Sequence, residues 1–211
     1  MTLHFNLADL FEQVADNFGG RDALVCGEQR ATYANLEQRA NKLAHYLLSR
    51  GVGQGDHVGL YSYNCNEYLE GMLACFKIRA VPVNVNYRYV KDELLYIYDN
   101  ANMVACIHNQ EFASRIAEIK KDAPRVTTYI AIADDSNADI SIIDAHFYED
   151  VIAEQSEQRD FAERSDDDVF LLYTGGTTGM PKGVIWPHKS LFFAALGGGG
   201  WFSPLGPCEV P

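Results

Sequence analysis

Apolar residues follow the helical repeat in several stretches of the chain. Residues 6–18 carry leucine, phenylalanine and valine three or four positions apart, and Gly19-Gly20 comes directly after them. This spacing places the apolar side chains on one helix face, and glycine often ends a helix. The same reasoning predicts further helices at 34–49, 66–78, 92–100 (with Asp92 as N-cap), 112–121, 142–157 and 188–196.

Short apolar runs of strand length lie between these helices. They are found at 56–61, 81–85, 103–107, 127–132, 169–172 and 184–186, and the pair 23–26 and 31–33 flanks a four-residue turn typical of a small hairpin. Strands that alternate with helices at this spacing predict an α/β fold with a doubly wound, largely parallel sheet and flanking helices. Residues 197–211 are rich in glycine and proline, which predicts an irregular tail.

Composition narrows the class of protein. The 211 residues give room for one domain with a sizeable core, and the net charge of −12 argues against a nucleic-acid binder. No apolar run approaches the roughly 20 residues of a transmembrane segment, and the first residues lack the pattern of a signal peptide. The 5 cysteines are odd in number and form no C-x-x-C pair. Free thiols in a reducing compartment are therefore expected, and we predict a cytoplasmic protein.

The stretch 173–183, which reads Y-T-G-G-T-T-G-M-P-K-G, carries the candidate chemistry. It lies between two predicted strands. Glycines let several backbone N–H groups point into one concavity, threonine hydroxyls add donors, and Lys182 adds a positive charge. The combination predicts a cradle for an oxyanion, most plausibly a polyphosphate. It is not a Walker-type loop, because Lys182 follows Pro181 and a strand-like segment comes next.

This stretch closely resembles the phosphate-binding signature Y-T-[SG]-G-T-T-G-x-P-K-G of the adenylate-forming (AMP-binding) superfamily, which includes acyl-CoA synthetases, peptide-synthetase adenylation domains and luciferases. Residues 31–44, 55–58 and 75–88 are also similar to acid–CoA ligases. Arg79 departs from the pattern, because the family usually has glycine there. If a tight helix-to-strand turn occurs at this point, Arg79 must adopt a conformation that glycine adopts more easily.

The resemblance implies a two-step reaction with ATP, Mg²⁺ and coenzyme A. A carboxylate attacks the α-phosphate of ATP to give an acyl-adenylate and pyrophosphate, and the coenzyme A thiol then displaces AMP. Glycine N–H groups would hold the β- and γ-phosphates, threonine hydroxyls would add contacts, and the lysine would neutralise the leaving charge. Mg²⁺ would come with ATP, held mainly by the phosphates. The implied nucleotide-binding residues are Thr174, Gly175, Gly176, Thr177, Thr178, Gly179 and Lys182, and we assign no catalytic or metal residue.

Other residues with reactive or aromatic side chains are assigned structural roles. His188 is interpreted as a structural or capping histidine in preference to a catalytic base. Tyr173 is expected to pack at the strand end. Phe192 and Phe193 would more commonly pack in the core than line an acyl pocket.

Members of this superfamily continue well beyond the length of this chain. The resemblance therefore implies that residues 1–196 are an incomplete N-terminal adenylation domain and that the chain is truncated in the tail 197–211. We expect the N-terminal part of an acid–CoA ligase, inactive alone, whose substrate by similarity is a fatty or sterol-derived acid. Two alternatives stay open: a non-catalytic nucleotide- or phosphate-binding module, and a degenerate gene product with exposed strand edges.

Overall fold

A mostly parallel sheet forms the centre of the computed structural model, which describes residues 4–26, 28–174, 180–200, 204, 206–209 and 211. Within these residues the sheet has seven strands in the order β7-β6-β5-β3-β4-β8-β9. All neighbouring strands are parallel except the pair β8 and β9. The strands are β3 (His57–Tyr61), β4 (Val81–Asn84), β5 (Met103–Asn109), β6 (Thr128–Ile132), β7 (His146–Phe147), β8 (Val169–Thr174) and β9 (Lys182–Pro187).

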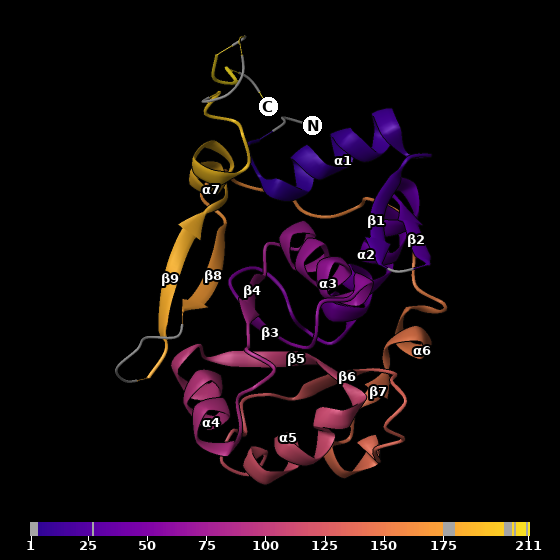
Figure 1. The fold of residues 1–211 in the computed structure, drawn as a ribbon, viewed down its shortest axis with the longest axis vertical. Coiled ribbons are helices and arrows are strands. Elements are labelled where there is room, and N and C mark those ends of the chain that lie inside the picture. Colours follow the sequence, from indigo (N-terminus) through magenta and orange to yellow (C-terminus); the bar gives the residue numbers. More distant parts are fainter. Residues whose placement is uncertain (1–3, 27, 175–179, 201–203, 205, 210) are drawn as a thin grey trace.

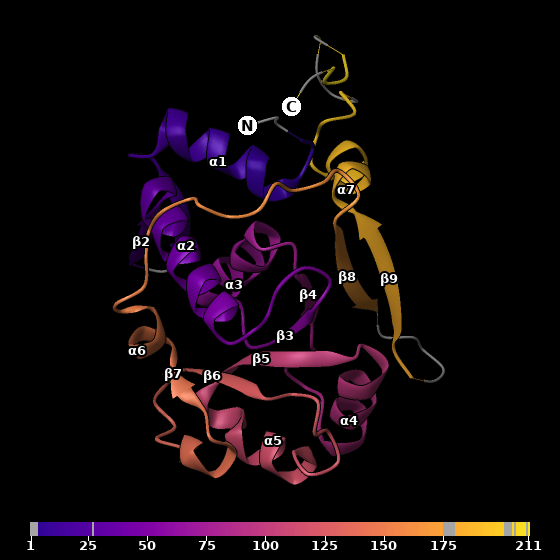
Figure 2. The same cartoon turned by 180° about the vertical axis from the view of Figure 1, so that it is seen from behind.

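Helices cover both faces of the sheet, which confirms the doubly wound α/β fold. Figures 1 and 2 show α2 (Tyr33–Ser49) and α3 (Asn66–Lys77) on one side of β5, and α4 (Lys91–Asn100) and α5 (Ala113–Ile119) on the other. Each layer encloses its own core of fully buried side chains, with Leu43 and Leu47 of α2 in one and residues of α4 and α5 in the other. Burial of these apolar side chains is the main force that holds the layers together.

A helix before the sheet, a small hairpin and a helix after the last strand add to these layers. Helix α1 (Leu7–Phe18) packs on α2 and α3, and its N-cap is Asn6, whose side chain accepts from the N–H of Ala8. The predicted hairpin is present as antiparallel β1 (Asp22–Cys26) and β2 (Gln29–Thr32). Helix α7 (His188–Ala195) follows β9, as predicted. Among the described residues, no helix combines the length and apolar character needed to cross a membrane.

The predicted helix over 142–157 is wrong. The chain instead forms a 3-10 turn (Ile140–Ile143), the short strand β7 and a five-residue helix α6 (Tyr148–Ile152). Asp144 adopts a left-handed conformation with φ of 56°, which interrupts any helix, and His146 and Phe147 then pair with β6. Sheet pairing therefore overrides the helical spacing of the apolar residues here.

The start of α4 also differs from the sequence prediction. The helix begins at Lys91 with Val90 as its N-cap, so Asp92 lies inside the first turn. The carboxylate of Glu93 accepts from the N–H of Val90 at 3.3 Å and satisfies one of the free donors at this end. Asp92 and Glu93 also place negative charge where the helix dipole favours it.

The segment 153–168 contains no helix or strand and crosses over α1 and α2 to reach β8 (Figure 2). Its two arginines hold it in place. Arg159 donates to Glu37 of α2 at 2.7 Å, and Arg164 donates to Glu12 of α1 at 2.7 Å. The fully buried Lys77, at the end of α3, binds the same two carboxylates at 2.7 and 2.5 Å. One ion network thus joins three helices to the segment that leads into the candidate site.

Candidate functional site

The hairpin of β8 and β9 brings together the two ends of the predicted phosphate loop. Its antiparallel register runs from Val169 opposite Pro187 to Thr174 opposite Lys182. Directly opposed residues in such a ladder lie about 5 Å apart. Thr174 and Lys182 are both exposed at the end of the hairpin. The other predicted contacts, Gly175, Gly176, Thr177, Thr178 and Gly179, lie outside the described residues.

Lys182 presents its charge to solvent. The side chain is exposed, and among the residues that the structure describes none forms an ion pair with it. The described buried lysine, Lys77, is by contrast enclosed between two carboxylates. An exposed ammonium group with no counter-ion among the described residues is available to an anionic ligand.

Tyr173 is fixed one step before the loop end of the hairpin. Its N–H donates to Oδ1 of Asn84 at 2.7 Å, and its hydroxyl donates to Oδ1 of Asn100 at 2.6 Å. The residue is only 7% exposed, and burial raises the pKa of the phenol. Tyr173 therefore packs at the strand end, as the sequence predicted.

The hairpin end lies at the carboxyl edge of the parallel strands. Strands β3, β4 and β8 all finish there, and a polar hollow of about 250 Å³ opens between their ends. Ligands of open α/β sheets bind at this edge, because loops from several strands converge there. The lining includes Ser62, Asn64, Tyr68, Asn84, Asn86 and Tyr173.

His188 has a structural role. It begins α7, is 1% exposed, and its Nδ1 accepts from the N–H of Leu7 at 3.3 Å. That N–H belongs to the first turn of α1 and has no partner within its own helix. Burial lowers the pKa of His188 to about 4, so the ring is neutral near pH 7. The structural or capping role predicted from the sequence agrees with this geometry.

Phe192 and Phe193 pack against the N-terminal segment. Their ring centroids lie 5.7 and 5.0 Å from that of Phe5. The two rings thus make packing contacts, but both are only partly buried and Phe192 also lines an apolar groove, so the expected place in the core is not what the structure shows.

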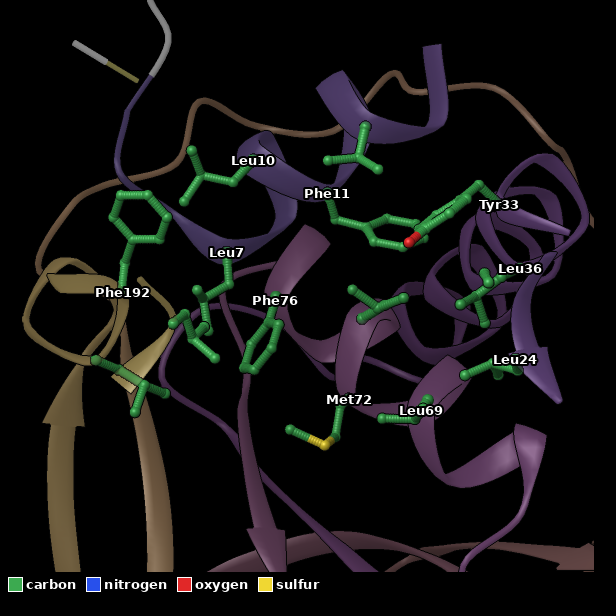
Figure 3. Close-up of a pocket in the computed structure, with 15 residues that line it drawn as sticks. Leu7, Leu10, Phe11, Leu24, Tyr33, Leu36, Leu69, Met72, Phe76 and Phe192 are labelled. Atoms are coloured by element: carbon green, nitrogen blue, oxygen red, sulfur yellow. The ribbon is translucent and has the colours of Figure 1, made fainter. Parts of the chain in front are cut away.

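An apolar groove of about 440 Å³ adjoins this aromatic cluster (Figure 3). In that view Leu7 and Phe11 of α1 lie above Met72 and Phe76 of α3, with Phe192 of α7 beside them. The lining also includes Leu10, Leu24, Tyr33, Leu36 and Leu69. The groove is distinct from the polar hollow at the carboxyl edge of the sheet.

A family model described as AMP-binding enzyme matches residues 11–206. The chain belongs to the AMP-binding enzyme family.

Two curated relatives of this AMP-binding chain are much longer than the chain itself. It is 48% identical over 194 residues to the 3-oxocholest-4-en-26-oate--CoA ligase of Rhodococcus rhodochrous, covering 92% of this chain and 35% of that protein. It is 45% identical over 202 residues to a medium/long-chain-fatty-acid--CoA/3-oxocholest-4-en-26-oate--CoA ligase of Mycobacterium marinum, covering 94% of this chain and 37% of the relative. The chain thus spans little more than a third of the length of these proteins.

Solved structures of AMP-binding relatives have the same fold. The anthranilate CoA ligase AuaEII in complex with anthranoyl-AMP matches with a TM-score of 0.79 and 25% identity, over 90% of this chain and 36% of that one. The N-terminal domain of FACL13 from Mycobacterium tuberculosis matches with a TM-score of 0.75 and 28% identity, over 88% of this chain and 45% of that one.

Sequence reasoning missed the two asparagines that hold Tyr173. Asn84 stands in the run Val-Pro-Val-Asn-Val, where it is the polar member of an otherwise apolar strand. A polar residue at the carboxyl end of a buried strand was a usable signal, because such a group needs a hydrogen-bonding partner. Asn100 ends α4 and carries no comparable signal in the sequence.

Proposed function

We propose that this AMP-binding chain is the N-terminal part of an ATP-dependent acid–CoA ligase, and that Thr174 and Lys182 contact the phosphates of ATP. The observation that carries the proposal is the hairpin register, which sets Thr174 opposite Lys182 at the carboxyl edge of the sheet. The proposed contacts also include Gly175, Gly176, Thr177, Thr178 and Gly179, through the backbone and hydroxyl donors of these residue types. Residues 1–196 are then an incomplete adenylation domain, with 197–211 as its tail.

The proposed reaction has two steps. A substrate carboxylate attacks the α-phosphate of ATP, and pyrophosphate leaves. The thiol of coenzyme A then attacks the acyl carbon, and AMP leaves. In the first step Lys182 would neutralise charge on the departing pyrophosphate, which lowers the barrier because the charge grows in the transition state.

Mg²⁺ enters the proposal bound to the phosphates of ATP. Within the described residues no three His, Cys, Asp or Glu side chains gather to hold a metal ion, so no residue of this chain is assigned to it.

The substrate class follows from the relatives alone. The Rhodococcus rhodochrous and Mycobacterium marinum proteins are named for sterol-derived and fatty acids. We assign the same class of carboxylic acid to the ligase of which this chain forms part. The cytoplasm is the proposed location, supported by the free thiols of Cys65, Cys75, Cys106 and Cys208.

Calorimetric titration of the 211-residue chain with Mg·ATP tests the phosphate contacts. We expect saturable binding that weakens about tenfold or more in Lys182→Ala, because a charge-assisted contact is lost. Lys189→Ala is the matched control, since it removes the same charge on α7, where the lysine pairs with Asp166 at 3.2 Å. Equal affinity of Lys182→Ala and the wild type for Mg·ATP would contradict the proposed contact between Lys182 and the phosphates.

A chimera tests the ligase reaction. Residues 1–206 would replace the matched part of the Mycobacterium marinum relative, and pyrophosphate release would be measured with a fatty acid and with a sterol-derived acid. We expect release that depends on acid and is slowed at least about a hundredfold by Lys182→Ala. A folded chimera that binds Mg·ATP without acid-dependent release would favour the non-catalytic binding module.

A further inference from the structure

Strands β4 and β8 separate just before the proposed phosphate site. Their parallel register places Val83 opposite Leu171. One residue further along β4, the side chain of Asn84, and not its backbone, forms the hydrogen bonds to β8. Its Oδ1 accepts from the N–H of Tyr173 at 2.7 Å, and its Nδ2 lies 3.5 Å from the carbonyl oxygen of Tyr173. The asparagine amide thus mimics a strand backbone and continues the connection between the two strands.

The ring of Tyr173 is held from a second direction. Its hydroxyl donates at 2.6 Å to Oδ1 of Asn100, the last residue of α4. The ring lies against Gly183, where an added Cβ would stand 3.1 Å from the ring atom Cζ. Glycine at 183 therefore gives the tyrosine ring room to reach α4. Tyr173 and Gly183 are direct partners across the hairpin, one step before Thr174 and Lys182.

We propose that Asn84 and Asn100 are positioning residues, which hold Tyr173 and through it set the orientation of Thr174 and Lys182 toward the ligand. This inference rests on the proposed phosphate site for its functional part. The geometry supplies the reason. The hairpin end projects from the sheet, and within the described residues its outer strand β9 pairs with β8 alone. Contacts from β4 and α4 to the last buried residue of β8 are therefore what ties the hairpin end to the body of the domain.

The local composition supports a role beyond packing. Asparagine is depleted in strands, and Asn84 interrupts a run of valines that fit the core better. Val83 and Val85, on either side, are 0% and 3% exposed. Asn84 itself is partly buried and lines the polar hollow, where its side-chain amide binds the backbone of Tyr173 one step before the hairpin end.

The test compares three variants of the 211-residue chain with a matched control. Asn84→Ala removes the bonds to the backbone, Tyr173→Phe removes only the bond to Asn100, and Asn84→Asp keeps an acceptor for the N–H of Tyr173. The control is Asn109→Ala. Asn109 accepts from the N–H of Tyr63 at 2.9 Å at the carboxyl end of β5, so it loses an equivalent bond without touching β8.

Two readouts are measured for each protein: amide hydrogen exchange at Tyr173 and Thr174, and the Kd for Mg·ATP. We expect Asn84→Ala to speed exchange at these amides about tenfold or more, and Asn84→Asp to retain their protection. Asn84→Ala and Tyr173→Phe should each raise the Kd at least about fivefold, whereas Asn109→Ala should leave both readouts at wild-type values.

Each outcome decides the proposal. Wild-type exchange and wild-type Kd in both Asn84→Ala and Tyr173→Phe would overturn it. An equal loss of affinity in Asn109→Ala would also overturn it, because the effect would then be general destabilisation. If the wild-type chain binds no Mg·ATP, the proposed phosphate site fails, and the exchange rates alone then decide whether Asn84 holds Tyr173. Tyr173→Phe keeps the ring, so it remains informative if Asn84→Ala does not fold.

Discussion

Arg79 shows how one residue combines backbone strain with an ion pair. It follows α3 and has φ of 60°, a left-handed conformation that costs a non-glycine residue roughly 1–2 kcal/mol. Its guanidinium Nη2 lies 2.9 Å from Oδ1 of Asp168, directly before β8. The same carboxylate accepts from the side chain of Asn6 at 3.0 Å. The arginine thus links the end of α3 to the start of the strand that bears the candidate site.

Substitutions at Arg79 separate the two effects. We expect Arg79→Ala to lower the free energy of unfolding by about 1–3 kcal/mol, because Asp168 loses its charged partner while the strain remains. Arg79→Gly should cost roughly 1 kcal/mol less than alanine, since glycine adopts positive φ freely. Urea denaturation measures the free energy of unfolding of both variants, and Arg88→Ala at an exposed position is the control. Identical losses for alanine and glycine would mean that the turn stores no strain.

Residue-scale prediction from the sequence succeeded where the signal was local. Arg79 stands where the family usually has glycine, so the sequence indicated that a tight helix-to-strand turn would force Arg79 into a conformation that glycine adopts more easily, and its φ of 60° shows such a conformation. Asn84 and Tyr173 are 89 positions apart, and no spacing rule connects residues so distant in the chain. Their contact follows from the strand order of the folded sheet, which only the structure supplies.

Two buried histidines should make stability depend on pH. Burial lowers the pKa of His108 and of His188 to about 4, from an ordinary value of 6.5. Because the folded pKa lies below the unfolded one, the unfolded chain takes up protons first as the pH falls. Stability is therefore complete above about pH 6.5 and decreases toward pH 4, and each unit of pKa difference corresponds to about 1.4 kcal/mol.

Thermal unfolding between pH 7 and pH 4 measures this dependence. His188→Gln keeps a hydrogen-bond acceptor for Leu7 but does not titrate, so we expect a shallower fall of Tm over this range than in the wild type. His146→Gln makes the same substitution at an exposed position on β7 and serves as the comparison. A slope that His188→Gln leaves unaltered would contradict the assigned role of the buried ring.

At the scale of elements, the ion network around Lys77 joins α1, α2, α3 and the segment 153–168. Lys77 is 0% exposed, with its Nζ 2.5 Å from Glu12 and 2.7 Å from Glu37. Arg164 and Arg159 supply further donors to these carboxylates. Breaking a buried network of this kind is costly, because the remaining charges stay out of water without their partner.

Lys77→Met is expected to lower the free energy of unfolding by about 3–5 kcal/mol, against about 0–1 kcal/mol for Lys189→Met at the surface. The double variant Lys77→Met/Glu37→Gln should lose less than the sum of its single changes, because it removes the orphaned charge together with its partner. Chemical denaturation of the four proteins forms the double-mutant cycle. Strict additivity would show that the two groups do not interact.

Element prediction failed where tertiary contacts outweighed periodicity. Ile142, Ile143 and Phe147 fit a helical stripe, yet His146 and Phe147 join the sheet edge beside β6. A strand of two residues has too few positions to show its own alternation. The extended segment that follows depends on arginines bound to α1 and α2, contacts that local sequence does not reveal. Longer elements, such as α2 and β6, were predicted to within two residues.

At the scale of the whole molecule, the apolar groove is a hollow whose lining side chains are almost all apolar. It holds about 440 Å³ between α1, the β1–β2 hairpin, α2, α3 and α7. Leu69 and Leu196 on its rim are 38% and 57% exposed. An apolar molecule that binds in the groove removes apolar surface from water. Each Å² removed stabilises the complex by about 25 cal/mol.

We therefore expect the folded 211-residue chain to bind the anionic apolar dye ANS in this groove. Leu69→Glu should weaken dye binding severalfold, because it adds a like charge at the rim, while the partly exposed position limits the cost to the core. Ile142→Glu makes the same change at a site 50% exposed and outside the groove, and it should leave dye binding unaltered. A cooperative melt must accompany the fluorescence, because loosely packed compact states also bind ANS. Equal dye affinity in the two glutamate variants would place the bound dye elsewhere on the molecule.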